Sequence, residues 1–241
     1  MSEQIAERSP RFKARVAGVF EALEGLASAY GQVIVLGKLI ISGNAATTAA
    51  NIVAHQGLFW LGYVSSVFGV AFHVVWIFLF YELFKPVNKR LALLATLVGI
   101  VVCGLQALTS LLYVAPLLIL KGGTALSGFT PGETQALAMV FLKLNAYAFN
   151  LDLVFFGFWC VLTGYLIFRS TFLPRILGVL LAVDGLGWMI YVYPPLANSL
   201  FMFIAAASAL AEIPLQLWLL IVGVNSDRWN EQARATGDGK S

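Results

Sequence analysis

Apolar residues run along this chain in six long stretches that are separated by short polar segments. The stretches are Val16–Leu36, Leu58–Leu83, Leu91–Leu112, Tyr147–Phe168, Ile176–Tyr193 and Leu200–Val224. Each approaches or exceeds the ~20 residues that a helix needs to cross the hydrocarbon core of a bilayer. The pattern predicts an all-α polytopic membrane protein, a six-helix transmembrane bundle in which residues 16–224 form a single membrane domain.

Composition strengthens this prediction. Of the 241 residues, 60% are hydrophobic and 11% are charged, whereas about a quarter of a soluble domain is charged. The six stretches consume most of the chain, so no separate soluble domain is expected. The formal net charge of +3 does not predict nucleic-acid binding, because the basic residues lie at the ends of the stretches rather than on one face.

The basic residues predict an orientation instead. They gather before the first stretch, between the second and third, between the fourth and fifth, and after the sixth: Arg8, Arg11, Lys13, Arg15, Lys85, Lys89, Arg90, Arg169, Arg175, Arg228, Arg234 and Lys240. By the positive-inside rule both termini are cytoplasmic, and the expected location is the cell inner membrane. Residues 1–15 are then a cytoplasmic N-terminal segment, and residues 225–241 a disordered cytoplasmic tail.

Local signals add detail between the stretches. Ser42–Asn44 has the composition of a helix start, and Thr130 with Glu133 forms the pattern of a capping box. A helix that began there and ended at Phe168 would be much longer than the bilayer is thick. We therefore expect it to break or turn back near Lys143–Asn145.

Ionisable residues inside the stretches indicate where chemistry could occur. Glu24, His73, Asp152, Asp184 and Glu212 come from five different helices, and all except Asp152 fall near the middle of the membrane. Buried ionisable groups in a membrane are costly and usually face a partner or a wet cavity. We expect these residues to share one cavity, with further binding residues on the same helical faces: Asn145, Phe156, Trp159 and Trp188. The alternative is a bundle held together by buried polar pairs.

Three functions remain open on these residues. The first is a carrier or binding protein for a small or lipophilic molecule, in which protonatable acids provide proton coupling. The second is an intramembrane enzyme in which Asp152, Asp184 or Glu212 is the catalytic acid and Phe156, Trp159, Trp188 and Tyr191 stabilise a carbocation. The third is a non-catalytic accessory protein. Partners other than the lipid bilayer and such a ligand are not predicted, and the oligomeric state stays open.

No cofactor is expected, because the chain lacks an HExxH motif and a glycine-rich phosphate loop followed by Lys-Ser or Lys-Thr. A haem held by two histidines would need a partner for His73, and His55 is predicted to lie outside the membrane. A metal bound by His73, Asp184 and Glu212 is conceivable, but these residues have no spacing signature, so no metal site is predicted.

Several short segments resemble a family of bacterial multi-pass membrane proteins, the domain of unknown function 4386. They are Phe80–Leu94, Phe155–Trp159, Gly164–Arg169 and Leu173–Gly178, together with Asn44–Asn51 and the terminal segment from Glu212 to Gly223. The resemblance covers nearly the whole chain. It implies a bacterial inner-membrane setting and supports six spans, but it supplies no activity and no catalytic residues.

Overall fold

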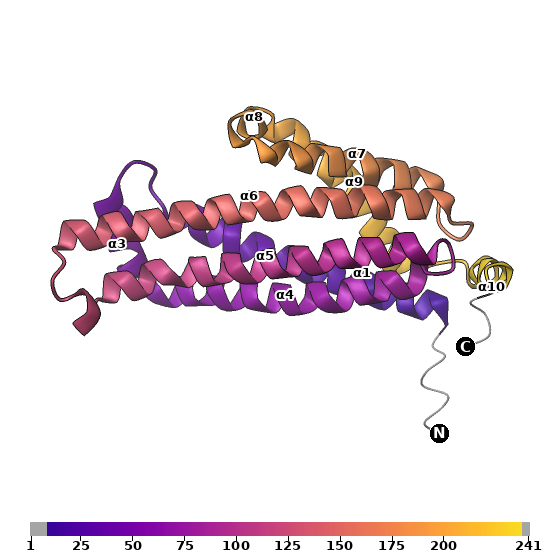
Figure 1. Ribbon diagram of the computed structural model, residues 1–241, viewed down its shortest axis with the longest axis horizontal. Helices are drawn as coiled ribbons and strands as arrows, with labels where there is room; N and C mark the ends of the chain where they lie inside the picture. The colour runs from indigo at the N-terminus through magenta and orange to yellow at the C-terminus, as the bar shows by residue number, and fades with distance from the viewer. Residues whose placement is uncertain (1–8, 238–241) are drawn as a thin grey trace, which may run out of the picture. The chain divides into compact units, whose positions relative to one another are not determined.

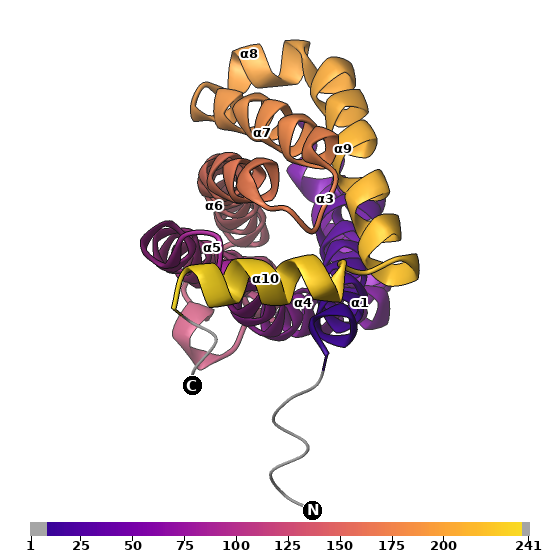
Figure 2. The ribbon, with the colours of Figure 1, turned by 90° about the vertical axis from the view of Figure 1, so that its right-hand side faces the viewer.

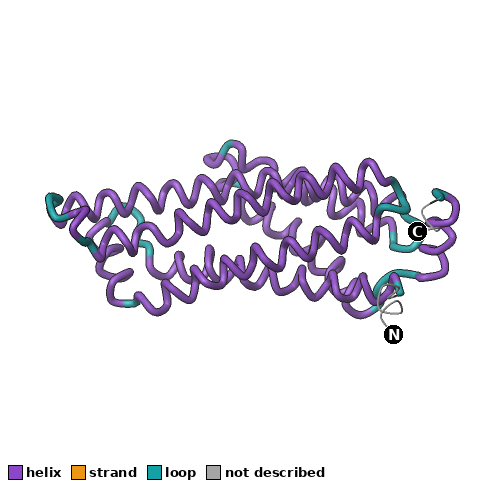
Figure 3. Tube along the Cα trace, turned by 60° about the horizontal axis from the view of Figure 1, so that its bottom comes forward, coloured by secondary structure: helices purple, strands orange, loops and turns teal. Residues whose placement is uncertain are grey.

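A computed structural model describes residues 9–237, and within this range every regular element is a helix (Figure 3). The α-helices are α1 (Pro10–Ser28), α2 (Leu36–Leu39), α3 (Ala45–Ala54), α4 (Gln56–Phe84), α5 (Lys89–Lys121), α6 (Pro131–Arg169), α7 (Arg175–Met189), α8 (Pro194–Ser199), α9 (Phe201–Ile221) and α10 (Ser226–Ala235). The π-helix η2 (Ala29–Val35) joins α1 to α2, and the 3-10 helices η3 (Thr124–Leu126) and η4 (Ile190–Val192) complete the order.

Six of the helical segments described between residues 9 and 237 are long and apolar enough to cross a membrane. They are Pro10–Leu39, Gln56–Phe84, Lys89–Lys121, Pro131–Arg169, Arg175–Val192 and Phe201–Ile221. Each contains or closely overlaps one predicted stretch, so the prediction of an all-α, multi-pass membrane protein is confirmed. Most segments extend past the predicted limits because polar residues continue the helices beyond their apolar parts.

The chain divides into two compact units, and several helices contribute to both. Unit 1 consists of Met1–Ala22, Phe72–Cys103 and Leu151–Ser241, and unit 2 of Leu23–Ala71 and Gly104–Asn150. Unit 1 therefore holds α7, α8, α9 and α10 with parts of α1, α4, α5 and α6. Unit 2 holds η2, α2 and α3 with the remaining parts of α1, α4, α5 and α6.

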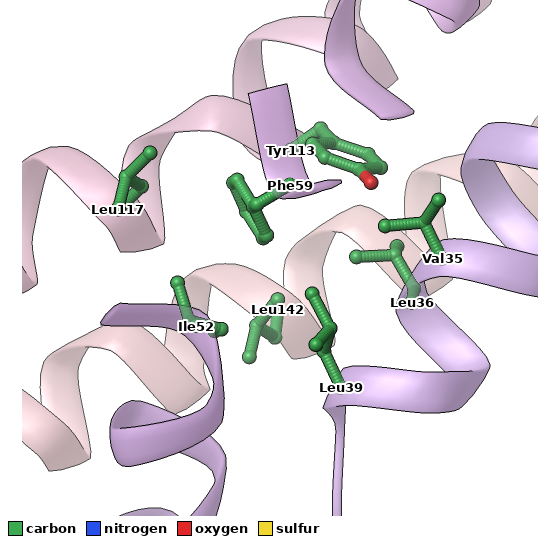
Figure 4. Close-up of a cluster of buried hydrophobic side chains, with 8 residues drawn as sticks. All are labelled: Val35, Leu36, Leu39, Ile52, Phe59, Tyr113, Leu117 and Leu142. Carbon is green, nitrogen blue, oxygen red and sulfur yellow. The ribbon is translucent and has the colours of Figure 1, made fainter. Parts of the chain in front are cut away.

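Unit 2 has an apolar core (Figure 4). Its buried side chains are Val35, Leu36, Leu39, Ile52, Phe59, Tyr113, Leu117 and Leu142. The rings of Phe59 and Tyr113 lie 4.8 Å apart. Asn44 begins α3 as predicted, because its side-chain oxygen accepts a hydrogen bond of 2.9 Å from the Thr47 N–H. The short helix α3 thereby brings Ile52 into this core.

Glycines bring α6 and α7 into backbone contact within unit 1. A Cβ atom on Gly185 would lie 2.5 Å from the carbonyl oxygen of Gly157, and one on Gly157 would lie equally close to the carbonyl of Gly185. Gly164 and Gly178 face each other in the same way along these helices. Membrane helices pack tightly where small residues meet, because apolar side chains gain little by leaving lipid. The α6–α7 contact therefore fixes the position of the polar residues on both helices.

The expected break near Lys143–Asn145 is wrong, because α6 continues unbroken from Pro131 to Arg169 (Figure 1). Its start is the predicted capping box, in which Glu133 accepts hydrogen bonds from the Thr130 N–H and hydroxyl. The Asn145 side chain is satisfied without a break, since its Nδ2 donates 2.8 Å to the carbonyl of Thr109 on α5. A 39-residue helix is about 58 Å long and exceeds the hydrocarbon thickness.

The predicted disordered tail also differs from the structure, which has helix α10 at Ser226–Ala235. Figure 2 looks onto this helix where it crosses the end of α4, and there the Trp229 indole N–H donates 2.9 Å to the carbonyl of Leu83. Gln232 accepts hydrogen bonds from the backbone N–H and hydroxyl of Thr171. These contacts with residues distant in the sequence order the segment. The predicted terminal segments also include residues 1–8 and 238–241, which lie outside the described residues.

Candidate functional site

Asp184 is the most deeply buried acid of the predicted set. It lies on α7 with 0% of its surface exposed, one residue before the glycine that contacts α6. Its carboxyl group faces Glu212, Trp188 and Cys160. Neither of its oxygens reaches hydrogen-bonding geometry with any group in the described part of the chain. A carboxyl group without a hydrogen-bond partner is costly inside an apolar helix bundle, so its presence calls for a functional explanation.

Glu212 on α9 is held in place by two donors. Its Oε1 accepts 3.1 Å from the indole N–H of Trp188 on α7 and 3.0 Å from the hydroxyl of Ser208, one turn earlier on α9. The bond from Trp188 links α7 to α9 and fixes the indole ring beside the two acids. The structure thus brings Asp184, Trp188 and Glu212 together, and their membership of one functional site stays a prediction.

A third acid and a thiol complete this group. Glu21 on α1 is buried, and Gly18 one turn earlier packs against Leu219 and Leu220 of α9. Cys160 on α6 is buried close enough to Asp184, Glu212 and Glu21 for all three carboxyl groups to act on it electrostatically. We call Glu21, Cys160, Asp184, Trp188 and Glu212 the acid group. Its members come from α1, α6, α7 and α9.

Sequence reasoning placed Glu21 on the polar face of the first span but did not choose it. The sequence did contain an indication that Glu21 faces the protein. The small residues Ala14, Ala17 and Gly18 precede Glu21 at helical spacing, and the structure buries all four. Small residues mark the side of a membrane helix that packs against its neighbours, so the acid on that side faces protein. Cys160 carried no comparable signal, because a buried cysteine is usually only a small apolar side chain.

His73 and the predicted aromatic residues form a second group in unit 1. The Trp76 ring lies 4.9 Å from His73, 4.7 Å from Trp159 and 6.3 Å from Phe156, while Phe80 lies 5.3 Å from Trp159. Because Trp76 pairs with Phe156 and Phe80 with Trp159, α4 and α6 run in the same direction here. One turn earlier on each helix, His73 and Asp152 are therefore at the same level. Both are buried and engaged by neighbouring groups.

A small pocket lies beside the aromatic residues of this group. It is lined by residues of α4, α5 and α6: Ile77, Phe80, Tyr81, Phe84, Ala92, Ala95, Thr96, Trp159, Thr163 and Leu166. Its free space corresponds to about one water molecule.

The four aromatic residues proposed for an enzyme fall into two sets, since Phe156 stacks on Trp159 whereas Trp188 lies 5.8 Å from Tyr191.

Glu24 and Asn145, the remaining predicted residues, both lie in unit 2. The Gln106 Nε2 donates 3.0 Å to Glu24 Oε1, and Asn145 donates to the Thr109 carbonyl. These contacts join α1 and α6 to α5 by hydrogen bonds.

Within the described residues, no three His, Cys, Asp or Glu side chains stand close enough to hold a metal ion.

Comparisons with known proteins bear on the family and not on the activity. No curated protein and no solved structure matches the chain. The sequence profile described as a domain of unknown function (DUF4386) matches residues 16–223, which is most of the chain; it covers five spanning segments completely and the first, Pro10–Leu39, from residue 16 onward. The chain therefore belongs to the DUF4386 family.

Proposed function

We propose that this protein is a proton-coupled carrier that binds a small or lipophilic molecule within the membrane. The acid group of unit 1 is its proton-binding site, and Asp184 is the residue that gains and loses the proton. The observation that carries the proposal is the complete burial of the Asp184 carboxyl group close to Glu212, with neither of its oxygens in hydrogen-bonding geometry with a described residue.

The chemistry follows from placing two carboxyl groups together in an apolar environment. Two adjacent negative charges repel each other, and each loses the hydration that stabilises it in water. The pair is most stable when it holds one proton. Glu212 accepts from Trp188 and Ser208 at one oxygen, so it is suited to be the ionised partner. Neither oxygen of Asp184 is in hydrogen-bonding geometry with a described donor, so Asp184 is suited to hold the proton.

Such a site can couple transport to a proton gradient if binding of the transported molecule changes whether the acids hold a proton. The members of the acid group lie on four helices that would have to move for access from either side of the membrane. We place both termini in the cytoplasm and the protein in the cell inner membrane, as the basic residues predict. Reporter fusions after Val224 and near Asn88 should then report cytoplasm, and a fusion near Gly123 the outside.

Carbodiimide labelling tests the proton-binding site directly. Dicyclohexylcarbodiimide reacts with carboxyl groups that are protonated in apolar surroundings, and mass spectrometry locates the adduct. We expect labelling of Asp184 or Glu212 in the full-length protein in nanodiscs, with loss of the adduct in an Asp184→Asn, Glu212→Gln double variant. Matched controls are Asp227→Asn and Glu231→Gln, since both acids are exposed on α10. An unlabelled wild-type protein at every pH would overturn the proposal.

A further inference from the structure

We propose that the transported molecule is a lipophilic organic cation, a substituted ammonium or phosphonium, which displaces the proton from Asp184. This inference rests on the proposed function and names the class of its substrate. It is carried by three features of unit 1: a completely buried carboxyl group whose oxygens are not in hydrogen-bonding geometry with a described residue, an aromatic pair that begins one turn further along the chain, and a proline in the helix that carries the second acid.

The first feature is a shortage of positive charge close to Asp184. The charged groups that face it are acids on other helices, Glu212 of α9 and, around the same thiol, Glu21 of α1. Helix α9 contains no Lys, Arg or His, and the one basic residue of α7 is Arg175 at its first position. The two hydrogen-bond donors described at Glu212 are already used on its Oε1. A ligand that brings its own positive charge therefore complements Asp184 better than an anion or a neutral molecule.

The second feature is a pair of aromatic rings, Trp188 on α7 and Tyr191 on η4, which follows α7 directly. Trp188 is held beside the acids by its bond to Glu212, and the Tyr191 ring lies 5.8 Å from it. Tyr191 is buried among apolar residues that include Val154 and Ile204. Aromatic faces attract cations, most strongly where water is excluded, and they also pack against the apolar substituents of the ligand. Carboxylates with adjacent aromatic rings are thus suited to a cation that is too hydrophobic to remain in water.

The third feature is a route from the bilayer. Pro214 lies two residues after Glu212 and cannot donate the hydrogen bond that would close the preceding turn of α9. Leu210 and Ile213 in the same region have 66% and 52% of their surface exposed, so this side of α9 faces away from the protein interior. A turn that is weakened beside Glu212 lets α9 bend away from α7. A lipophilic cation dissolved in the membrane could then reach Asp184.

Exchange of the cation for a proton at Asp184 explains how cation transport is coupled to proton transport without an additional binding site. A cation binds best when both acids are ionised, whereas a proton on Asp184 removes one of its two partners. Cation and proton therefore compete, and binding of one releases the other. The affinity for the cation should fall as the pH is lowered. Each cation carried in one direction is exchanged for protons carried in the other.

Tetraphenylphosphonium is a suitable substrate analogue, because it is a permanent cation with four aromatic groups. We would measure binding of the radiolabelled cation to the full chain in nanodiscs, correct for empty nanodiscs, and follow proton release in weakly buffered solution. We expect saturable binding with proton release, and an affinity that is lower by about tenfold or more in Asp184→Asn. Tyr191→Leu, which removes one aromatic face, should weaken binding about threefold to tenfold, whereas Tyr165→Leu on an exposed side of α6 should not.

Several results would overturn this inference. One is equal binding of triphenylphosphine oxide, which has similar aromatic groups but no net charge. Another is binding of tetraphenylphosphonium without proton release, or with the same affinity in Asp184→Asn. Carbodiimide labelling of the same preparation separates the two proposals. Labelled acids with no cation binding would leave the proton site intact and refute only the substrate class, whereas unlabelled acids would refute the proton site itself.

Discussion

Asp184 of unit 1 is buried in a different way from the polar side chains of unit 2. In unit 2 the buried groups are joined by hydrogen bonds, such as Asn145 to the Thr109 carbonyl and the Tyr113 hydroxyl to the Gly31 carbonyl at 3.4 Å. In unit 1 the carboxyl group of Asp184 is buried at least as deeply, yet neither oxygen is hydrogen-bonded by a described residue. The first arrangement joins helices at little cost, whereas burial of a carboxyl group outside hydrogen-bonding geometry costs free energy of folding.

This difference separates structural polar residues from functional ones. A hydrogen-bonded amide between helices contributes to stability, so selection for stability alone explains it. A buried acid lowers stability, so selection for stability does not explain it, and we propose that Asp184 is retained for the chemistry described above. Substitutions should therefore have opposite effects on stability in the two units, and this contrast organises the predictions that follow.

The largest effect should come from the glycine contact that positions the acid group. In Gly185→Ala the new Cβ would collide with the Gly157 carbonyl, which is backbone and cannot turn aside. We expect a loss of about 1–3 kcal/mol in the free energy of unfolding, measured by thermal unfolding in detergent. Gly187→Ala on the same helix is the control, because its Cβ would meet Ile204 at an ordinary distance of 3.6 Å. Equal stability of the two variants would contradict the close α6–α7 contact.

A smaller effect of opposite sign should follow from neutralising the unpartnered acid. Asp184→Asn keeps the shape of the side chain and removes the group that can ionise, so the protein should be as stable as wild type or more stable by about 1 kcal/mol. Carbodiimide labelling at this position and cation binding should be lost together. A clearly less stable Asp184→Asn protein would indicate that the carboxyl group is a structural contact.

Asn145→Leu makes the corresponding test in unit 2. The substitution removes the hydrogen bond to the Thr109 carbonyl and should lower the free energy of unfolding by about 1 kcal/mol, a typical value between membrane helices. Its control is Asn150→Leu, because Asn150 is only half-buried on the same helix. If Asn145→Leu stabilised the protein instead, the two units would no longer differ in the way described here.

The smallest effect is expected at α10. Trp229→Phe keeps an aromatic ring but removes the hydrogen bond to the Leu83 carbonyl, which should weaken the docking of this helix by about 1 kcal/mol. Trypsin should then cleave faster after Arg228 and Arg234, while the rest of the protein remains resistant. Trp60→Phe, an exposed position of unit 2, serves as the control and should not change the cleavage rate.

Features that depend on neighbouring residues in the chain were predictable from the sequence. The six apolar spans, the start of α3 at Asn44 and the capping box at Thr130 follow from composition and spacing alone. The continuity of α6 was not predictable, because Asn145 finds its partner on another helix. Helix α10 was missed for the same reason, since Trp229 and Gln232 are held by residues far away in the sequence.

The candidate site was predictable in part. The predicted depth in the membrane grouped Asp184 with Glu212, and the structure places these two carboxyl groups close together. Depth does not determine which way a helix is rotated, so it did not distinguish Glu21 from Glu24. The structure assigns Glu21 to the acid group and gives Glu24 a hydrogen bond from Gln106 in unit 2. The choice depends on the packing partner of α1, which a single sequence does not contain.

The central claim is that Asp184 carries an exchangeable proton within the membrane. Infrared difference spectroscopy of the full-length protein in nanodiscs, titrated over pH, measures it most directly, because a protonated carboxyl group has a carbonyl stretching band that a carboxylate lacks. We predict a titrating band that disappears in Asp184→Asn and persists in the exposed control Asp227→Asn. A band that is absent from the wild type, or unchanged in Asp184→Asn, would contradict the claim.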